Sequence, residues 1–394
     1  MAVNKFDNSM LDAGTIGTTA NKLLQLDGSA KIPAVDGTLL TNIPPSFTKS
    51  ASDPVITTNP SGGVGTLWAN TTSGEVYCCT DATAGANVWT NIGAGSGNVQ
   101  LLWYGGRGLW AGGHTGGYKD TVDYITIATP GNATDFGNLS ASVEGLAGVS
   151  NGSRGIIVGG EPIVNHAQMD YYTISTPGNA SDFGDISASR YGLGGCANGI
   201  RGIFTGGVGS VTGDSPGGYY DTIDYVTIAT LGNAVDFGDR TLHNYHVGSC
   251  SDGSRGVTGG GSTSSAQVNV IDYVTIATTS DATDFGDLSA IRSHPGAAAS
   301  ETRGIFGGGK EGSNPGVNTM EYITIATTGN TTDFGDLTQA RKNVSATSNI
   351  TRGVWGAGDS SDTIDYVEIA TLGNATDFGN LTEARQWCGT TSGD

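Results

Sequence analysis

The stretch that decides the fold is TIDYVTIATLGNAVDFGD, residues 222–239, because nearly the same phrase occurs six times in the chain. Each copy begins with R-G-x-x-x-(G/A)-G and continues, after a variable loop, with (D/E)-Y-x-x-I-(A/S)-T and D-F-G-(D/N). The Arg-Gly pairs begin at Arg107, Arg154, Arg201, Arg255, Arg303 and Arg352, with spacings of 47, 47, 54, 48 and 49 residues. A catalytic phrase is needed once, whereas a structural phrase recurs in every unit of an array, so the repetition favours a structural role.

Each copy is expected to contain four short strands. The β-branched, alternating YVTIAT predicts one strand, RGIFTGG a second, and DFGDL an outer strand whose Phe packs inward. A fourth strand is expected in SASRYGLGGCANG and its equivalents, and the Gly-Asn of LGNA and PGNA predicts a turn. Gly206 and Gly207 are expected where backbones approach closely. Four strands in about 45–50 residues are typical of a propeller blade.

The carboxyl-terminal tail bears on how the array closes. Arg190, Arg292 and Arg341 each precede the next Arg-Gly pair by 11 residues, and the last equivalent, Arg385, stands nine residues before Asp394. We therefore expect Gln386–Asp394 to supply the fourth strand of the first unit, which removes an exposed sheet edge. The stretch NVQLLWYGG, residues 98–106, either competes for that place or crosses as a connector.

The repeat resembles the kelch family of propellers. Its di-glycine recurs, for example at Gly112-Gly113 and Gly206-Gly207. The tyrosine of its third strand recurs as Tyr124, Tyr171, Tyr225, Tyr273, Tyr322 and Tyr366. The tryptophan that opens the family's fourth strand is replaced by Phe136, Phe183, Phe237, Phe285, Phe334 and Phe378. The resemblance implies an all-β chain in which residues 98–394 form a six-bladed kelch-like β-propeller closed by the C-terminal strand.

The first hundred residues do not repeat. ANKLLQLDGSAKIPAVDGTLL, residues 20–40, looks like a segment of tailed-phage fibre and related virion proteins, where such segments form trimeric stalks or attach a fibre to the particle. Residues 65–93 resemble a small β module of phage structural proteins, with Trp68, Tyr77 and Trp89 as its expected core. We expect an attachment and oligomerisation segment at 1–45, then a linker and this module at 46–97. The resemblance implies a homotrimer in the virion, bound to other virion proteins through the N-terminal segment.

The composition of the chain excludes some classes of binding partner. The chain has 394 residues, 65 of them glycine, and a net charge of −19 from 18 basic and 37 acidic residues. This balance argues against nucleic-acid binding and against docking on an anionic membrane. We expect no membrane insertion, because no apolar run reaches 18 residues and the N-terminus lacks the features of a signal peptide. Five cysteines do not suggest a disulfide framework, and Cys196 and Cys250, at one repeat position, are expected to be buried.

The sequence contains few candidate residues for catalysis or metal binding. The DFG(D/N) carboxylates, such as Asp236 and Asp239, are either calcium ligands or turn caps, and we favour caps. The Arg-Gly arginines and the acidic residue before each tyrosine predict ion pairs or capped turns, with a charged ring around the channel as the alternative. His243 and His246 fall on a predicted strand, where they would face opposite sides. We therefore expect no catalytic residues, no metal site, no cofactor and no enzymatic activity.

The loop between the di-glycine and the third strand varies most between copies, from 5 to 15 residues. Such insertions on one face of a repeat array usually mark the binding face, although drift in exposed loops is the alternative. The candidate binding residues in these loops are His114, Tyr118, Lys119, His166, Tyr219, Tyr220, Lys310 and Glu311.

These features predict a virion structural protein, a fibre or spike that displays the propeller for adhesion to a host-surface glycan or protein. One alternative is a purely structural decoration or connector protein of the capsid or tail. A second is a polysaccharide-degrading enzyme, which needs clustered carboxylates in a central cleft that break the sixfold pattern, and the sequence indicates none.

Overall fold

The structure of the chain is a computed structural model that describes residues 48–92, 103–162, 167–209 and 218–394. They belong to two compact units, one within Met1–Val99 and one within Gln100–Asp394. The described part is all-β, with 28 strands in seven four-stranded sheets and no helix. Accordingly, it includes no helical segment that could span a membrane. The expected attachment segment, residues 1–45, lies outside the described residues.

The first unit contains one small sheet. Its strands, hydrogen-bonded in chain order, are β1 (Thr48–Ser50), β2 (Leu67–Asn70), β3 (Val76–Asp81) and β4 (Val88–Asn91). β1 is parallel to β2, and the other neighbours are antiparallel. Tyr77 and Trp89 are buried, and the ring of Trp68 meets that of Trp89 edge-on with centroids 5.8 Å apart. The predicted aromatic core of this module is confirmed.

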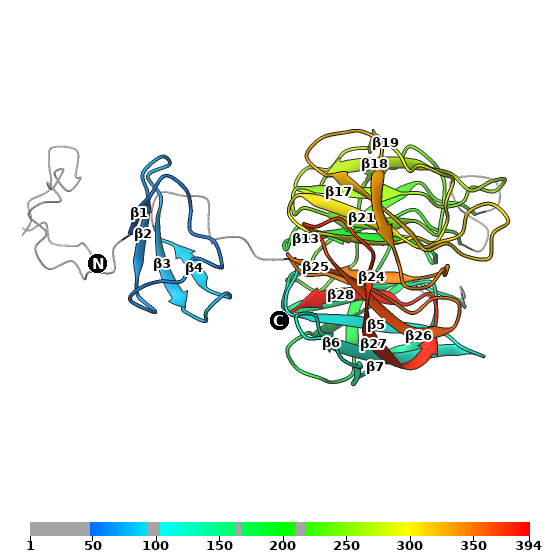
Figure 1. The fold of residues 1–394 in the computed structure, drawn as a ribbon, viewed down its shortest axis with the longest axis horizontal. Helices are drawn as coiled ribbons and strands as arrows, with labels where there is room; N and C mark the ends of the chain where they lie inside the picture. The colour runs from blue at the N-terminus through cyan, green and yellow to red at the C-terminus, as the bar shows by residue number, and fades with distance from the viewer. Residues whose placement is uncertain (1–47, 93–102, 163–166, 210–217) are drawn as a thin grey trace, which may run out of the picture. The chain divides into compact units, whose positions relative to one another are not determined.

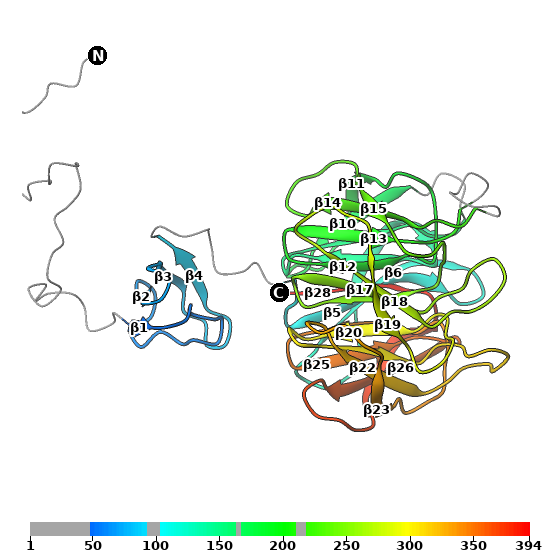
Figure 2. The ribbon, with the colours of Figure 1, turned by 90° about the horizontal axis from the view of Figure 1, so that it is seen from above.

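The second unit contains six four-stranded antiparallel sheets (Figures 1 and 2). The first has the order β28 (Gly389–Gly393), β5 (Arg107–His114), β6 (Tyr118–Thr126), β7 (Thr134–Val143). The second and third are β8 (Ala147–Ser150), β9 (Arg154–Val158), β10 (Gln168–Thr173), β11 (Ser181–Asp185), and β12 (Gly194–Ala197), β13 (Arg201–Thr205), β14 (Thr222–Thr227), β15 (Val235–Asp239). The fourth and fifth are β16 (Gly248–Ser251), β17 (Arg255–Gly259), β18 (Val270–Thr275), β19 (Thr283–Asp287), and β20 (Gly296–Ala299), β21 (Arg303–Gly307), β22 (Thr319–Thr324), β23 (Thr332–Asp336). The sixth is β24 (Ser345–Ser348), β25 (Arg352–Gly356), β26 (Ser361–Glu368), β27 (Thr376–Arg385).

The carboxyl-terminal strand lies beside the first strand of the array. Residues 386–394, expected to complete the first sheet, contribute β28, which pairs with β5 from Gly389 opposite Ala111 to Gly393 opposite Arg107. In Figure 1 the red end of the chain accordingly lies against the cyan strand β5. The inner strands are neighbours in the cyclic order β28, β8, β12, β16, β20, β24, so the six sheets have a propeller-like arrangement.

The described end of the 98–106 stretch runs across the sheets as a connector. The main-chain oxygen of Trp103 accepts a hydrogen bond from Ser150 in the second sheet, and the Tyr104 hydroxyl donates one to Glu301 in the fifth. Trp103 also packs against two apolar clusters, one formed by the second and third sheets and one formed by the fourth and fifth sheets. The place beside β5 belongs to β28, so the connector does not compete for it.

The glycines of the six DFG motifs lie where the backbones of neighbouring sheets approach closely. At Gly184, φ is +140°, and an added Cβ would stand 2.5 Å from the carbonyl oxygen of Gly232 in the next sheet. The equivalent glycines, each facing the next sheet in the same way, are Gly137, Gly238, Gly286, Gly335 and Gly379. The last meets Gly131 of the first sheet. The motif recurs because no other residue fits this joint.

The arginines of the Arg-Gly pairs form a second set of joints. Each guanidinium lies over the tyrosine ring of its own sheet, 4.4 to 4.9 Å from the ring centroid. Each Nη1 also donates a hydrogen bond to an isoleucine carbonyl of the next sheet: Ile174, Ile228, Ile276, Ile325 and Ile369. The sixth such bond, from Arg352, returns to Ile127 of the first sheet.

The acidic residue before each tyrosine does not pair with these arginines, so that predicted pairing is wrong. Instead it pairs with the arginine that precedes an inner strand: Arg385 with Asp123, Arg190 with Asp224, Arg240 with Asp272, Arg292 with Glu321, and Arg341 with Asp365, at 2.5 to 3.0 Å. The second sheet is the exception, because Val143 stands in the arginine position and Asp170 accepts hydrogen bonds from Ser140. None of these paired residues lines the central channel, so they form no charged ring around it.

Candidate functional site

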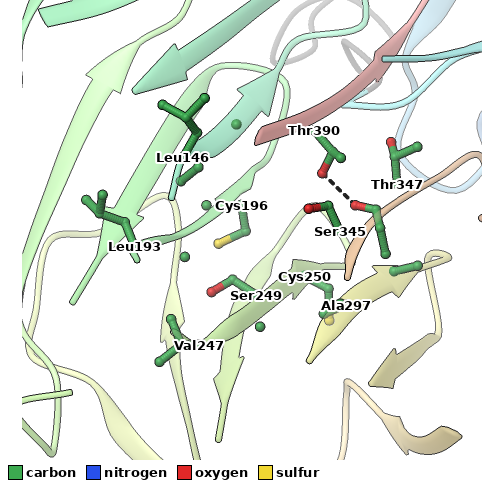
Figure 3. Close-up of a pocket in the computed structure, with 18 of the residues that line it drawn as sticks. Leu146, Leu193, Cys196, Val247, Ser249, Cys250, Ala297, Ser345, Thr347 and Thr390 are labelled. Carbon is green, nitrogen blue, oxygen red and sulfur yellow. Dashed lines mark hydrogen bonds between the residues drawn. The ribbon is translucent and has the colours of Figure 1, made fainter. Parts of the chain in front are cut away.

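A central channel, with an internal volume of about 160 Å³, lies between the six inner strands (Figure 3). Small and apolar side chains such as Leu193, Val247 and Ala297 line it, and Trp103 lies at the end where the inner strands finish. The predicted burial of Cys196 and Cys250 is confirmed. Burial raises the pKa of Cys196 to about 12, so this thiol stays protonated at neutral pH. The described side chains that line the channel between the inner strands therefore pack against one another and include no reactive thiolate.

The other end of the channel has a rim of six equivalent residues, one before each inner strand: Gly145, Gly192, His246, His294, Asn343 and Trp387. All six have φ between 56° and 73°. Glycine adopts this conformation freely, asparagine and histidine tolerate it better than most residues, and a bulky residue such as tryptophan rarely adopts it. Strain of this kind costs about 1 to 3 kcal/mol per residue and concentrates at functional sites. The six repeats therefore differ at the rim, where four of them have a histidine, an asparagine or a tryptophan that could contact a ligand.

Eight rings form a continuous aromatic arc on the face that contains the rim: Tyr118, His114, Trp387, His294, His246, Tyr245, Tyr191 and Tyr219. The centroids of the rings in contact are 3.6 to 6.4 Å apart, close enough for direct interaction. The arc branches at its end, where the rings of Tyr191 and Tyr219 both contact Tyr245. The shortest distance joins His246 to His294. Tyr118 is 41% exposed, and the other members are partly exposed. The arc therefore presents ring faces and edges to solvent.

The two rim histidines are neutral at physiological pH. Burial, with the nearby ring of His294, lowers the pKa of His246 well below its usual range. Burial and the positive charges of Lys310 and Lys342 lower the pKa of His294 to about 3. Two neutral imidazoles can stack at the observed distance without the repulsion that two imidazolium ions would suffer. They act as aromatic surface and hydrogen-bonding groups rather than as cations.

Beside the rim lies a second cavity of about 320 Å³, which we name the rim pocket; it is lined by His294, Lys310, Lys342, Asn343, Asp359, Ser360, Gln386 and Trp387. Five of these eight are non-glycine residues with positive φ, out of seven such residues in the described chain. Two buried polar atoms here, Asn343 Oδ1 and Trp387 Nε1, have no hydrogen-bond partner among the residues that the structure describes. Strain and unsatisfied polar groups coincide in this pocket, as they do at ligand sites.

Two carboxylates lie near the same arc. The backbones of Glu144 and Glu161 form an antiparallel bridge, and Glu144 Oε2 is 4.0 Å from Nδ1 of His114. Burial, with the negative charge of Glu161, raises the pKa of Glu144 to about 7. This pair departs from the sixfold pattern, but neither glutamate lines the central channel, where the sequence indicated no clustered carboxylates. Only the folded chain brings the two residues together.

The structure distributes the predicted binding residues over different roles. His114, Tyr118 and Tyr219 belong to the arc, and Lys310 lines the rim pocket. Lys119 pairs with Glu383 at 2.9 Å, and Glu311 pairs with Arg292 at 2.7 Å. Tyr220 is only 6% exposed and lies against the guanidinium of Arg190, so its ring is unavailable to a ligand. His166 lies outside the described residues.

Sequence reasoning missed His246, His294, Lys342, Asn343 and Trp387. The sequence does contain a signal for the rim. The residue two positions after Arg190, Arg292, Arg341 and Arg385 is a glycine, a histidine, an asparagine and a tryptophan, so this position varies where the rest of the repeat is nearly constant. The strand predicted over residues 243–246 is also wrong, since these residues precede β16 without forming a strand. His243 pairs with Asp221 at 3.1 Å, while His246 stacks on His294.

In the described residues, no three His, Cys, Asp or Glu side chains converge in a way that could hold a metal ion. Comparison with known proteins adds no assignment: no family model matches the chain, and no curated protein matches it. The geometry of the rim and the arc therefore carries the functional argument alone.

Proposed function

We propose that this chain is an appendage of a tailed-phage virion, a fibre or spike that binds a host-surface glycan or protein without chemical catalysis. The second unit would be a closed six-bladed propeller of the kelch-like kind. Closure is supported by the arginine hydrogen bonds that run from sheet to sheet and return from Arg352 to Ile127. The virion location is supported by the phage-like segments at residues 20–40 and 65–93.

The single observation that carries adhesion is the aromatic arc. Aromatic rings offer large, rigid contact area at low entropic cost, and their faces pack well on the apolar C–H faces of sugar rings. The arc is continuous across segments that lie far apart in the chain, from Tyr118 to Trp387. Its position on the face of the variable loops fits a recognition surface. These features favour a glycan over a protein ligand.

In this proposal residues 1–45 attach the chain to other virion proteins and assemble it as a homotrimer. Three linked propellers increase attachment through avidity even where each site binds weakly. No nucleic-acid or membrane partner is proposed, in keeping with the net charge of −19.

The test uses the labelled full-length chain and a panel of bacterial strains with defined surface polysaccharides. A strain that binds the protein is selected, and Tyr191→Ala/Tyr245→Ala is compared with Leu372→Ala, whose side chain is exposed away from the arc. Loss of two stacking rings is expected to weaken binding at least about tenfold, while the control binds as the wild type does. Equal binding by all three proteins would contradict the aromatic arc as the binding surface, and binding to no strain of the panel would favour a purely structural decoration or connector role.

A second candidate function, glycan hydrolysis, has one observation in its favour. Glycosidases pair a carboxylic acid of raised pKa with a carboxylate, and Glu144 and Glu161 have this relation. Incubation of the protein with the polysaccharide of the bound strain is expected to release no reducing ends. Release that disappears in Glu144→Gln would establish the enzyme instead.

A further inference from the structure

We propose that the rim pocket binds a carboxylated sugar residue, such as a uronic acid, so that the receptor is an acidic polysaccharide. The inference rests on the proposed adhesion and names the class of glycan. It comes from the two lysines that line the pocket, from the charge balance of the pocket and from its unsatisfied polar groups.

The first step concerns the available positive charge. All eleven arginines of the chain lie in the described second unit, and all are committed: six stack on tyrosines and five pair with buried acids. The unit has three lysines, of which Lys119 is held by Glu383. The other two, Lys310 and Lys342, both line the rim pocket. Two of three lysines thus gather at one cavity of a strongly acidic chain.

The second step is the charge balance. The lining includes two lysines and one carboxylate, Asp359, while His294 is neutral, which leaves one net positive charge. Lys342 Nζ is 3.8 Å from Asp359, whereas no ion pair of Lys310 occurs among the described residues. A carboxylate with one negative charge neutralises the net positive charge of the pocket, whereas a phosphate with two negative charges would leave the pocket net negative.

The third step is hydrogen bonding. Within the described parts of the chain, Asn343 Oδ1 has no hydrogen-bond donor and Trp387 Nε1 has no acceptor, although both atoms are buried. The Asn343 amide nitrogen is already used, since it donates to Gln386 Oε1 at 3.0 Å. Both atoms are closed to solvent, so the hydroxyls of a sugar, which donate and accept, can satisfy them only if the side chains of Asn343 and Trp387 move to admit the sugar. The rings of Trp387 and His294, whose centroids are 6.4 Å apart, supply apolar walls for the sugar ring.

The fourth step is size. A cavity of about 320 Å³ lies at the lower end of the range for small-molecule sites and suits one monosaccharide. The rim pocket adjoins the arc through the shared rings of His294 and Trp387. One acidic residue can therefore occupy the pocket while neighbouring sugars extend along the arc.

The test measures binding of methyl glycosides of glucuronic, galacturonic and N-acetylneuraminic acid to the full-length chain, each beside its carboxyl-reduced partner. At least one acid is expected to bind about tenfold or more tightly than its reduced form, as one charge-assisted hydrogen bond supplies. Lys310→Met and Lys342→Met are each expected to remove most of this preference. Lys49→Met, an exposed lysine of the first unit, is the control for net charge and is expected to retain it.

The proposal is overturned if no acid binds more tightly than its reduced partner, or if both pocket variants keep the wild-type preference. Tighter binding of glucose 6-phosphate or glucose 6-sulfate than of any carboxylate also contradicts it. Cell adhesion separates this inference from the function on which it rests. If Lys310→Met/Lys342→Met adheres as the wild type does while Tyr191→Ala/Tyr245→Ala does not, the acidic-sugar inference fails and adhesion stands.

Discussion

At the joints between neighbouring sheets the same side chains recur in nearly every copy, whereas the rim position holds two glycines, two histidines, an asparagine and a tryptophan. The joints recur because each sheet must fit the next at the same short distance, as at Gly184. The rim has no such requirement, since glycine fills its backbone conformation at Gly145 and Gly192 without strain. The non-glycine residues of the rim lower stability at positions that glycine could occupy, which indicates a role other than folding.

The largest expected effect comes from breaking a buried ion pair of a joint. Arg385 and Asp123 are fully buried and paired at 2.8 Å, so Arg385→Leu leaves a carboxylate without its cation. The free energy of unfolding is expected to fall by about 3 to 5 kcal/mol, measured by urea denaturation of the full-length chain.

The matched control is Arg385→Leu/Asp123→Leu, which removes both charges. It is expected to recover much of the loss, because an apolar pair of similar volume is often as stable as a buried ion pair. The second sheet already has Val143 in the arginine position. If the double variant is as unstable as the single one, the pair acts through packing rather than charge.

The next effect comes from a DFG glycine. Gly184→Ala places a methyl group 2.5 Å from the Gly232 oxygen at a φ of +140°, and is expected to cost about 2 to 4 kcal/mol. Gly117→Ala, at a glycine with open space around it, is expected to change stability by less than about 0.5 kcal/mol. Equal urea midpoints for the two variants would contradict the account of the joints.

The sequence predicts the joints far better than the rim. Alternation and repetition place strands such as β14 and β15, and the inward Phe237, because these depend on local pattern. The partner of Asp224 could not be predicted, because Arg190 reaches it from the preceding repeat. The rim depends on positive φ at four non-glycine residues, a conformation that is uncommon outside glycine. The arc joins rings from several sheets, so it exists only once the array is folded.

The histidines of the rim predict a pH dependence of stability. Their folded pKa values lie below the usual value, so below about pH 6.5 the unfolded chain takes up protons that the folded chain excludes. Stability is therefore expected to fall as the pH decreases from about 6.5 towards 4, by at most about 1.4 kcal/mol per pH unit for His246. His246→Asn, which tolerates the positive φ, is expected to reduce this slope.

Protonation of Glu144 changes the stability of the fold in the opposite direction. Its folded pKa is raised to about 7, so its protonation favours the folded state as the pH falls through the same range. The histidine contribution is therefore measured in a Glu144→Gln background, by urea denaturation at several pH values. An unchanged slope after His246→Asn in that background would mean that the rim histidines titrate normally.

The smallest expected effect on stability comes from making the rim symmetric. His246→Gly/His294→Gly/Asn343→Gly/Trp387→Gly gives every rim position the residue found at Gly145 and Gly192. Relief of backbone strain and loss of ring packing are expected to offset each other to within about 2 kcal/mol over the four sites. A loss as large as that of Arg385→Leu would mean that the rim serves folding.

Adhesion of this symmetric-rim variant tests the central claim most directly. The measurement is the half-saturating concentration of labelled full-length protein on a bacterial strain that binds the wild type. The account predicts a folded protein that binds at least about tenfold more weakly. Wild-type adhesion by the folded variant would contradict the claim that the departures from symmetry at the rim form the binding site.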